Sequence, residues 1–204
     1  MAEIRPFCCV HPATEVVSQV AALPYDVYNR EEARQAIEGK PLSFLNIDRP
    51  ETMFAPDQDM YAPEVYEAAR QRLEEQKQAG VYVKEEQPVY YLYELTMDGR
   101  SQTGLVACAS IDEYENHVIK KHENTRAEKE ADRIRHVDVC SAQTGPIFLA
   151  YRAKDEIRAL VQNVKNAQPE FSFTSEDGIH HAGWKIGEPE LVKKIHTAFQ
   201  QVDS

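Results

Sequence analysis

The stretch Val89-Tyr90-Tyr91-Leu92-Tyr93-Glu94-Leu95-Thr96 decides the fold class of this 204-residue chain. Its aromatic and aliphatic residues are typical of a β-strand. The dipeptide Asp98-Gly99 follows and favours a tight hairpin turn. The small and apolar residues from Thr103 to Ile111 then predict a returning strand that is buried on both faces. The centre of the chain therefore predicts an antiparallel hairpin.

Working outward, the flanking segments predict further strands and helices. A second hairpin is expected around the turn Asp177-Gly178, with strands at 171–174 and 179–186. Short apolar runs predict additional strands at 7–10, 43–47 and 146–151. Helices are predicted after Asn29 (with Glu32 as its capping-box partner), from Pro63, over 154–165 and from Pro189. This order indicates an α+β fold with a mixed, largely antiparallel sheet built from hairpins with flanking helices, as one region over residues 1–204.

The composition narrows the classes of function. A formal net charge of -11 argues against nonspecific nucleic-acid binding by the whole surface. No apolar run is long enough to span a bilayer, and the N-terminus lacks the apolar core of a signal peptide, so we expect a cytoplasmic protein without a membrane partner. The cysteines form no Cys-x-x-Cys pair and are expected to be reduced and mostly buried: Cys8, Cys9, Cys108 and Cys140.

The stretch 122–136 predicts a basic helix in this acidic protein. Thr125 and Glu128 are expected to form a capping box that opens it. Four cationic positions fall within roughly 80° of one another on such a helix: Arg126, Lys129, Arg133 and His136. A narrow apolar stripe is expected to dock it: Ala127, Ala131 and Ile134. The cationic row indicates either an anion site, with phosphate as the usual anion, or a solvated face with intrahelical ion pairs.

Three other polar segments are candidate functional positions. His122 and Glu123 lie just before the basic helix, where they are either a catalytic pair or an ordinary exposed loop pair. Asp26 lies in a compact turn and is either a carboxylate at a cleft edge or part of a local Asx-type turn. Gly145 either permits close approach of the backbone to a ligand or ends the helix. The histidine spacings do not favour a transition-metal site.

Several segments together carry a family resemblance: Ile4-Arg5-Pro6-Phe7, Pro24-Tyr25-Asp26-Val27, Ser43-Phe44-Leu45, Thr103-Gly104-Leu105-Val106, 118–125, Lys129 with 132–136, and Gln143-Thr144-Gly145-Pro146. With these motifs in this order, the chain resembles the domain-of-unknown-function 1015 family, often labelled ParB-like. Members of that family are longer and carry a downstream Gly-His-His-Arg motif, similar to the phosphate-contacting box of ParB-type nucleotide-binding domains and of the related free-serine kinases. The resemblance implies that this chain is the N-terminal half of a longer protein.

The resemblance further implies a nucleotide-dependent phosphotransferase that acts on a small hydroxyl metabolite such as free L-serine. Mg²⁺ with ATP or ADP would supply the phosphoryl group. Glu123 would take the hydroxyl proton and His122 would orient it, while Asp26 or Asp132 would help to hold magnesium. The residues expected to bind phosphate or nucleotide are Arg126, Lys129, Arg133, Thr144 and Gly145. The alternatives are a non-catalytic ParB-like module that senses nucleotide or binds a partner, and a truncated inactive fragment.

Overall fold

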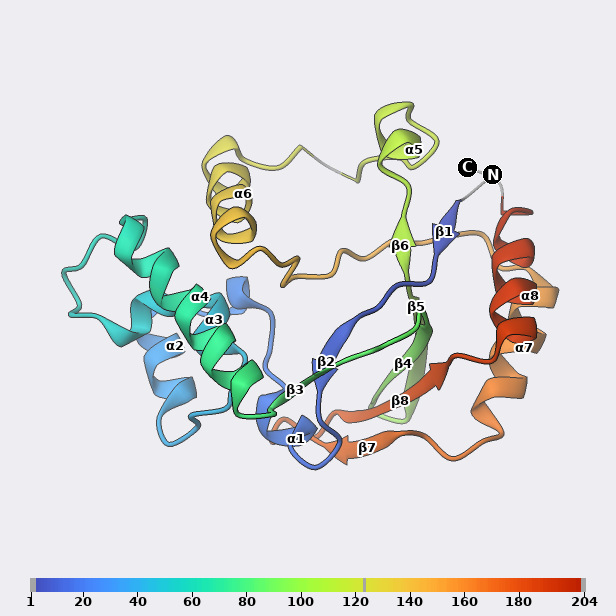
Figure 1. Ribbon diagram of the computed structural model, residues 1–204, viewed down its shortest axis with the longest axis horizontal. Coiled ribbons are helices and arrows are strands. Elements are labelled where there is room, and N and C mark those ends of the chain that lie inside the picture. Colours follow the sequence, from blue (N-terminus) through green and yellow to red (C-terminus); the bar gives the residue numbers. More distant parts are fainter. Residues whose placement is uncertain (1–2, 123, 203–204) are drawn as a thin grey trace. The chain divides into compact units, whose positions relative to one another are not determined.

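The computed structural model describes residues 3–122 and 124–202 and divides the chain into two compact units. Unit 1 contains the described residues of Met1–Thr14, Lys84–Glu123 and Leu149–Ser204. Unit 2 contains those of Glu15–Val83 and Asn124–Phe148. Figure 1 labels the helices and strands of both units. Each unit has its own apolar core and is described by itself.

Unit 1 is built on a four-stranded antiparallel sheet with the order β5-β4-β8-β7. These strands are β4 (Tyr90–Met97), β5 (Arg100–Val106), β7 (Phe171–Thr174) and β8 (His180–Ile186). The helices α7 (Asp155–Lys165) and α8 (Pro189–Phe199) lie beside it (Figure 1). The other elements are β1 (Ile4–Arg5), β2 (Val10–Pro12), β6 (Cys108–Ala109) and α5 (Ile111–Glu115). Strands β1 and β6 form a separate antiparallel pair. The unit therefore has the expected α+β architecture.

The alternation of side chains along β4 and β8 separates a core face from an outer face. Tyr90 and Leu92 point into the core, where they meet residues of β8 and of the two helices: Ala182, Trp184, Ile186, Ile157, Val164, Ile195 and Phe199. Burying a leucine such as Leu92 contributes about 1.5–3 kcal/mol. Tyr91 and Lys185 are cross-strand neighbours, and the period of two directs them to the outer face. On that face Tyr91 is buried in a smaller apolar cluster with Cys9 and Val89, and Lys185 is exposed beside it.

Both hairpin predictions are confirmed. Asp98 and Gly99 have φ values of 52° and 74°, as a two-residue hairpin turn requires, and Gly178 has a φ of 82° in the second hairpin. The expectation that the returning strand is buried on both faces is wrong. Strand β5 lies at the edge of the sheet, and none of its residues is fully buried, because only β4 covers one of its sides.

Two of the predicted short strands, at 7–10 and 146–151, are not formed as expected. In the segment 7–10, Phe7 makes only an isolated bridge to Val89, and the strands β1 and β2 flank it. The segment 146–151 is irregular, with Ile147 69% and Phe148 78% exposed, so the predicted strand there is wrong. An apolar run becomes a strand only when another strand satisfies its backbone groups, and no described strand pairs with this one.

Unit 2 is mainly helical. Its elements are α1 (Val17–Val20), the 3₁₀-helices η1 (Tyr25–Val27) and η2 (Pro50–Met53), α2 (Arg30–Ile37), α3 (Leu45–Asp48), α4 (Pro63–Gln78) and α6 (Ala127–Cys140). Strand β3 (Tyr82–Lys84) lies where the chain passes from this unit to the other. The predicted cap of α2 is confirmed, since Asn29 and Glu32 exchange side-chain and backbone hydrogen bonds. Helix α4 begins at Pro63, as predicted.

The segment 43–47 was predicted to be a strand, and this prediction is wrong because its second half begins helix α3. A short apolar run does not distinguish a strand from a buried helical turn. Here the Asn46 side chain donates hydrogen bonds to the carbonyl groups of Lys40 and Ser43, which closes the chain into a helical turn. Ile47 is consequently buried in the core of unit 2, and Asp48 ends the helix beneath α6.

The remaining expectations concern the membrane and the thiols. No helix among the described residues is long and apolar enough to cross a membrane. All four cysteines are free; Cys9 and Cys140 are buried, and Cys8 and Cys108 are exposed. Burial raises the pKa of Cys9 and of Cys140 to about 11, so both thiols stay protonated at neutral pH.

Candidate functional site

The candidate site of unit 2 is built around α6, whose start differs from the prediction. The helix begins one residue later than a cap at Thr125 requires, and Arg126 is the N-cap residue without a side-chain cap hydrogen bond. The predicted Thr125–Glu128 capping box is therefore wrong. Arg126 and Lys129 are both exposed at this end of the helix.

The predicted docking stripe is also wrong, because α6 buries a polar face. Ala127 and Ala131 are exposed and Ile134 is 56% exposed, whereas the buried residues are Asp132, His136 and Cys140. These three lie four residues apart and so share one side of the helix. A helix can bury a polar face only if the groups on it find partners, and the structure supplies them from α3, α4 and the segment after α6.

Asp132 is held by helix α4. The hydroxyl of Tyr66 donates a hydrogen bond of 2.8 Å to Asp132 Oδ1. Burial, followed by the adjacent Asp132 carboxylate, raises the pKa of Tyr66 well above its ordinary value, so Tyr66 remains a donor. This hydrogen bond joins α6 to α4.

His136 is the most enclosed polar side chain of the cluster, with 1% of its surface exposed. Its Nε2 lies 2.9 Å from the carbonyl oxygen of Ile47, which can only accept, so Nε2 carries a proton. Its Nδ1 lies 3.4 Å from the hydroxyl of Thr144. His136 thus joins three segments: α3, α6 and the loop that follows α6.

Arg133 is flanked by carboxylates. Its Nε and Nη2 donate hydrogen bonds of 3.2 Å and 3.1 Å to Asp132 Oδ2, and its Nη1 lies 3.9 Å from Asp48 Oδ1. The guanidinium also lies 4.1 Å from the centre of the Tyr25 ring. The Arg133 side chain remains 29% exposed. The carboxylates of Asp132 and Asp48 therefore balance the positive charge of Arg133, one member of the predicted cationic row.

Asp48 is the least satisfied charged group of the cluster. Only 13% of its side chain is exposed, and its Oδ1 has no hydrogen-bond partner among the described residues. Burial raises the pKa of Asp48, while His136, Arg133 and the Thr144 hydroxyl act in the opposite direction without cancelling it. A buried carboxyl with a raised pKa beside a histidine and an arginine is typical of sites that move protons.

The other predicted site residues are dispersed. Glu123 lies outside the described residues, and His122 is exposed and belongs to unit 1. Asp26 is exposed on η1. Gly145 does not end the helix, which stops at Cys140 with Ser141 in the left-handed region, and a β-carbon at Gly145 would meet no atom within 4 Å.

The structure brings together Asp132, Arg133, His136 and Thr144 and adds two residues that the sequence did not indicate, Asp48 and Tyr66. The sequence offered one signal for Asp48, namely that this acidic residue directly follows a short apolar run. The strand predicted for 43–47 would not bring that acid beneath α6. Tyr66 lies on the buried face of α4, and its hydroxyl contact with Asp132 depends on the tertiary packing.

The comparisons with known proteins place the chain in a family without assigning a function. No curated protein and no solved structure matches it. The sequence profile of one family, described as a protein of unknown function (DUF1015), matches residues 4–204. This match extends over nearly all of the chain and includes every residue of the cluster around α6. The chain therefore belongs to the DUF1015 family.

Proposed function

We propose that the chain is part of a ParB-like, nucleotide-dependent phosphotransferase that acts on a small hydroxyl metabolite, with free L-serine as the first substrate to test. The observation that carries this proposal is the pair formed by Asp48 and Arg133. Asp48 Oδ1 has no hydrogen-bond partner among the described residues, and Arg133 Nη1 lies 3.9 Å from it. That separation is too long for a direct hydrogen bond.

A hydroxyl group within hydrogen-bond distance of both atoms would bridge them. It would donate its proton to Asp48 Oδ1 and accept a hydrogen bond from Arg133 Nη1, so both groups would be satisfied at once. A bridging water would satisfy them equally well, and it is the structural alternative. The two alternatives differ in their consequence, since only a substrate hydroxyl makes Asp48 necessary for turnover.

The environment of Asp48 suits a proton acceptor. Its raised pKa keeps the carboxylate more basic than an exposed aspartate, and a general base is most effective when its pKa approaches the working pH. His136 and Thr144 are positioning residues in this scheme, because their hydrogen bonds tie the loop after α6 to the carboxylate. In this proposal Asp48 takes the role that the family resemblance implied for Glu123.

The charges of the cluster favour a phosphate that carries a metal ion. Two carboxylates flank Arg133, so a bare phosphate would meet uncompensated negative charge. Asp48 and Asp132 offer the oxygen ligands that Mg²⁺ prefers, and exposed Asp26 is an additional candidate. Arg126, Lys129 and Thr144 would face the phosphates, with Gly145 beside them. When bound, Mg²⁺ and nucleotide would supply the phosphoryl group and neutralise its charge.

Phosphoryl transfer from Mg-ATP or Mg-ADP to labelled L-serine tests the proposal, with the longest available protein that contains this chain. We expect formation of phosphoserine, at least a 100-fold lower rate for Asp48→Asn, on the order of what general-base catalysis contributes, and an unchanged rate for Asp138→Asn, an exposed acid on α6. Arg133→Gln should weaken nucleotide binding more than Arg135→Gln. Nucleotide binding without transfer to any hydroxyl acceptor would contradict the enzyme and favour a sensing module.

A further inference from the structure

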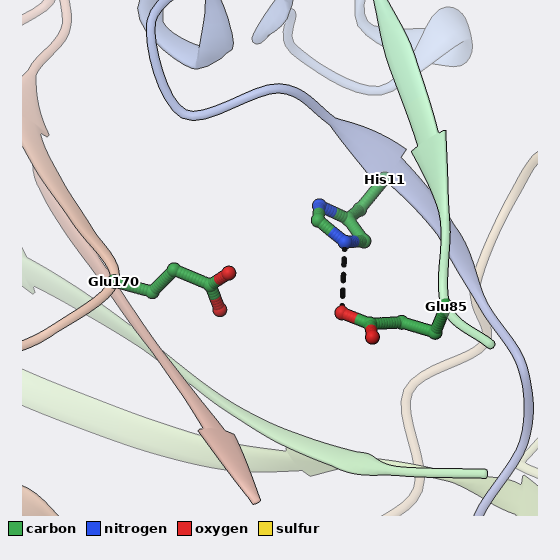
Figure 2. Close-up of side chains that lie close together, drawn as sticks. All are labelled: His11, Glu85 and Glu170. Carbon is green, nitrogen blue, oxygen red and sulfur yellow. Dashed lines mark hydrogen bonds and ion pairs between the residues drawn. The ribbon is translucent and has the colours of Figure 1, made fainter. Parts of the chain in front are cut away.

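Unit 1 contains a second polar cluster, on the outer face of its sheet. Figure 2 shows the side chains of His11, Glu85 and Glu170 directed toward one another from three separate segments. One potential ligand atom from each residue lies within 4.8 Å of the other two. Among residues 3–122 and 124–202, this is the one group of three or more histidine, cysteine or acidic side chains with such spacing.

The backbone fixes all three positions. The N–H of Glu85 donates to the carbonyl of Cys9 at 2.9 Å, which ties residue 85 to the strand that carries His11. The N–H of Glu170 donates to the carbonyl of Gly183 at 2.8 Å, which ties residue 170 to β8. These contacts place the three side chains on ordered backbone, as a preformed binding site requires.

The orientation of His11 points to a ligand at Nε2. Its Nδ1 lies 3.0 Å from the carbonyl oxygen of Pro12, so the proton of a neutral ring lies on Nδ1 and the lone pair on Nε2. That lone pair faces Glu85 Oε1 at a distance of 3.1 Å. The Tyr91 hydroxyl lies 3.3 Å from Nε2 and 2.9 Å from Glu85 Oε1, but its single proton cannot serve both acceptors. The close pair of acceptors therefore favours a cation between or beside them, either a second proton on His11 or a metal ion. Metal-binding histidines commonly donate their other N–H to a backbone carbonyl in this way.

Glu170 supplies an independent observation. Its Oε2 is buried and has no hydrogen-bond partner among the described residues. Burial, followed by the nearby carboxylates of Glu85 and Glu170, raises the pKa of the Tyr91 hydroxyl far above its ordinary value. Two carboxylates therefore converge on one tyrosine, and one of their oxygens is unsatisfied. Such an oxygen costs free energy unless a cation or a donor reaches it.

We propose that His11 Nε2, Glu85 and Glu170 bind one divalent first-row transition-metal ion, with Zn²⁺ as the reference ion. One imidazole with two carboxylates suits Zn²⁺, Fe²⁺ or Mn²⁺ better than Ca²⁺ or Mg²⁺, which prefer oxygen ligands alone. Metal–ligand bonds near 2.1 Å put neighbouring ligand atoms about 3.4 Å apart in a tetrahedral site. The present spacing of up to 4.8 Å requires only a small closure of the two glutamate side chains.

Lys185 is the competitor in this site. Its ammonium lies 2.5 Å from Glu85 Oε2, while Oε1 of the same carboxylate faces His11. Without a metal ion, Lys185 balances part of the negative charge, and the cluster is then an ion-pair network. Removing the lysine should have opposite effects under the two alternatives. A metal site gains affinity, because a competing positive charge is lost, whereas a purely structural network gains nothing for metal.

Calorimetric titration of the 204-residue chain with Zn²⁺, after treatment with a chelator, tests the proposal. We expect one ion per chain, and at least a 10-fold loss of affinity in Glu170→Gln and in His11→Gln. The control His180→Gln removes an exposed histidine of β8 that hydrogen-bonds only to Ser172 and Thr174 in the described structure, and it should bind as the parent does. Equal affinity in parent and Glu170→Gln, or no binding by the parent, would overturn the proposal.

Three further measurements separate loss of metal binding from loss of folding. Glu170→Gln should keep or raise the metal-free melting temperature, because it neutralises an unsatisfied carboxylate, yet it should abolish the rise that Zn²⁺ produces in the parent. Lys185→Gln should bind Zn²⁺ more tightly than the parent, and weaker binding by a folded Lys185→Gln protein would contradict the assignment. Co²⁺ in place of Zn²⁺ should give visible d–d absorption that Glu170→Gln loses.

Discussion

The two polar clusters combine the same kinds of groups, but the pKa of Glu85 in unit 1 and the pKa of Asp48 in unit 2 are shifted in opposite directions. In unit 1, burial pushes the pKa of Glu85 upward, but its contacts with Lys185, Tyr91 and His11 outweigh burial and hold the pKa below the ordinary value of 4.5. Glu85 is therefore a stable anion, as structural ion pairs and metal ligands are.

In unit 2, burial prevails over the neighbouring charges. Asp48 has Arg133 at 3.9 Å and one oxygen without a hydrogen bond, and its pKa is raised above 3.8. The comparison teaches that the number of donors on a buried carboxylate, more than the presence of a nearby cation, decides whether it stays charged. Asp48 is accordingly the better candidate for proton transfer, and Glu85 the better candidate for cation binding.

The largest effect should come from His136, which anchors the polar face of α6. His136→Ala leaves a cavity and removes the donor to the Ile47 carbonyl, so we expect a loss of about 3 kcal/mol in the free energy of unfolding. Urea unfolding followed by far-UV circular dichroism measures it. The matched change Ile134→Ala, at an exposed position of the same helix, should alter stability by less than about 0.5 kcal/mol. Comparable losses of unfolding free energy in both variants would mean that the predicted apolar stripe is the face by which α6 packs.

Gly183→Ala should disturb the other cluster without changing a titratable group. A β-carbon at Gly183 would lie 2.2 Å from the ring of Phe171, the residue next to Glu170, so the ring must move. We expect unit 1 to lose about 1–3 kcal/mol. The fluorescence of Trp184, the only tryptophan and a unit 1 residue, reports this loss selectively. Gly104→Ala, whose nearest atom would be 4.0 Å away, is the control, and an unshifted Trp184 transition in Gly183→Ala would refute the close contact.

Glu85→Gln should lower the stability of unit 1 by about 1–2 kcal/mol at neutral pH, because Tyr91 and Lys185 lose their charged acceptor. The folded-state pKa of Glu85 is lowered, so its contribution is present above its ordinary value of 4.5 and disappears as the pH falls through the lowered pKa. The difference between parent and variant should therefore vanish in acid. A difference of equal size at neutral and acidic pH would show that the effect is one of packing.

Asp48→Asn should produce the smallest change in stability and one of opposite sign. Because the folded-state pKa of Asp48 is raised, the folded state holds its proton more tightly, and stability falls as the pH rises from 3.8 to that raised pKa. Asparagine removes this penalty, so the variant should gain stability relative to the parent at neutral pH and not in strong acid. Thermal unfolding at both pH values measures this, with Asp138→Asn as the control. A loss at neutral pH would mean that Arg133 stabilises the charged form.

Local signals in the sequence accounted for much of the fold. The Asp98-Gly99 and Asp177-Gly178 turns, the Asn29–Glu32 box and Pro63 each act within a few residues, and each is confirmed. The misassigned strands at 43–47 and 146–151 share a different property. Each is a short apolar run whose conformation depends on whether distant backbone groups pair with it, which no local pattern records.

The candidate sites were harder to predict because they join distant segments. His11 and Glu85 are 74 residues apart in the chain, and neither has a neighbour that marks it as a ligand. Asp132 and Arg133 were recognised because they lie in a conspicuous charged helix. The residues that contact the buried face of that helix were not predicted. That face is polar, whereas an analysis of helix amphipathicity looks for an apolar face.

A carboxyl ¹³C NMR titration of the folded chain tests the central contrast most directly, with Asp48→Asn and Glu85→Gln used to assign the two signals. The structure predicts that Asp48 titrates above 3.8 and that Glu85 titrates below 4.5 in the same sample. Titration of Asp48 at or below 3.8 would show that Arg133 and Thr144 already satisfy it, and the proposed proton acceptor would be lost.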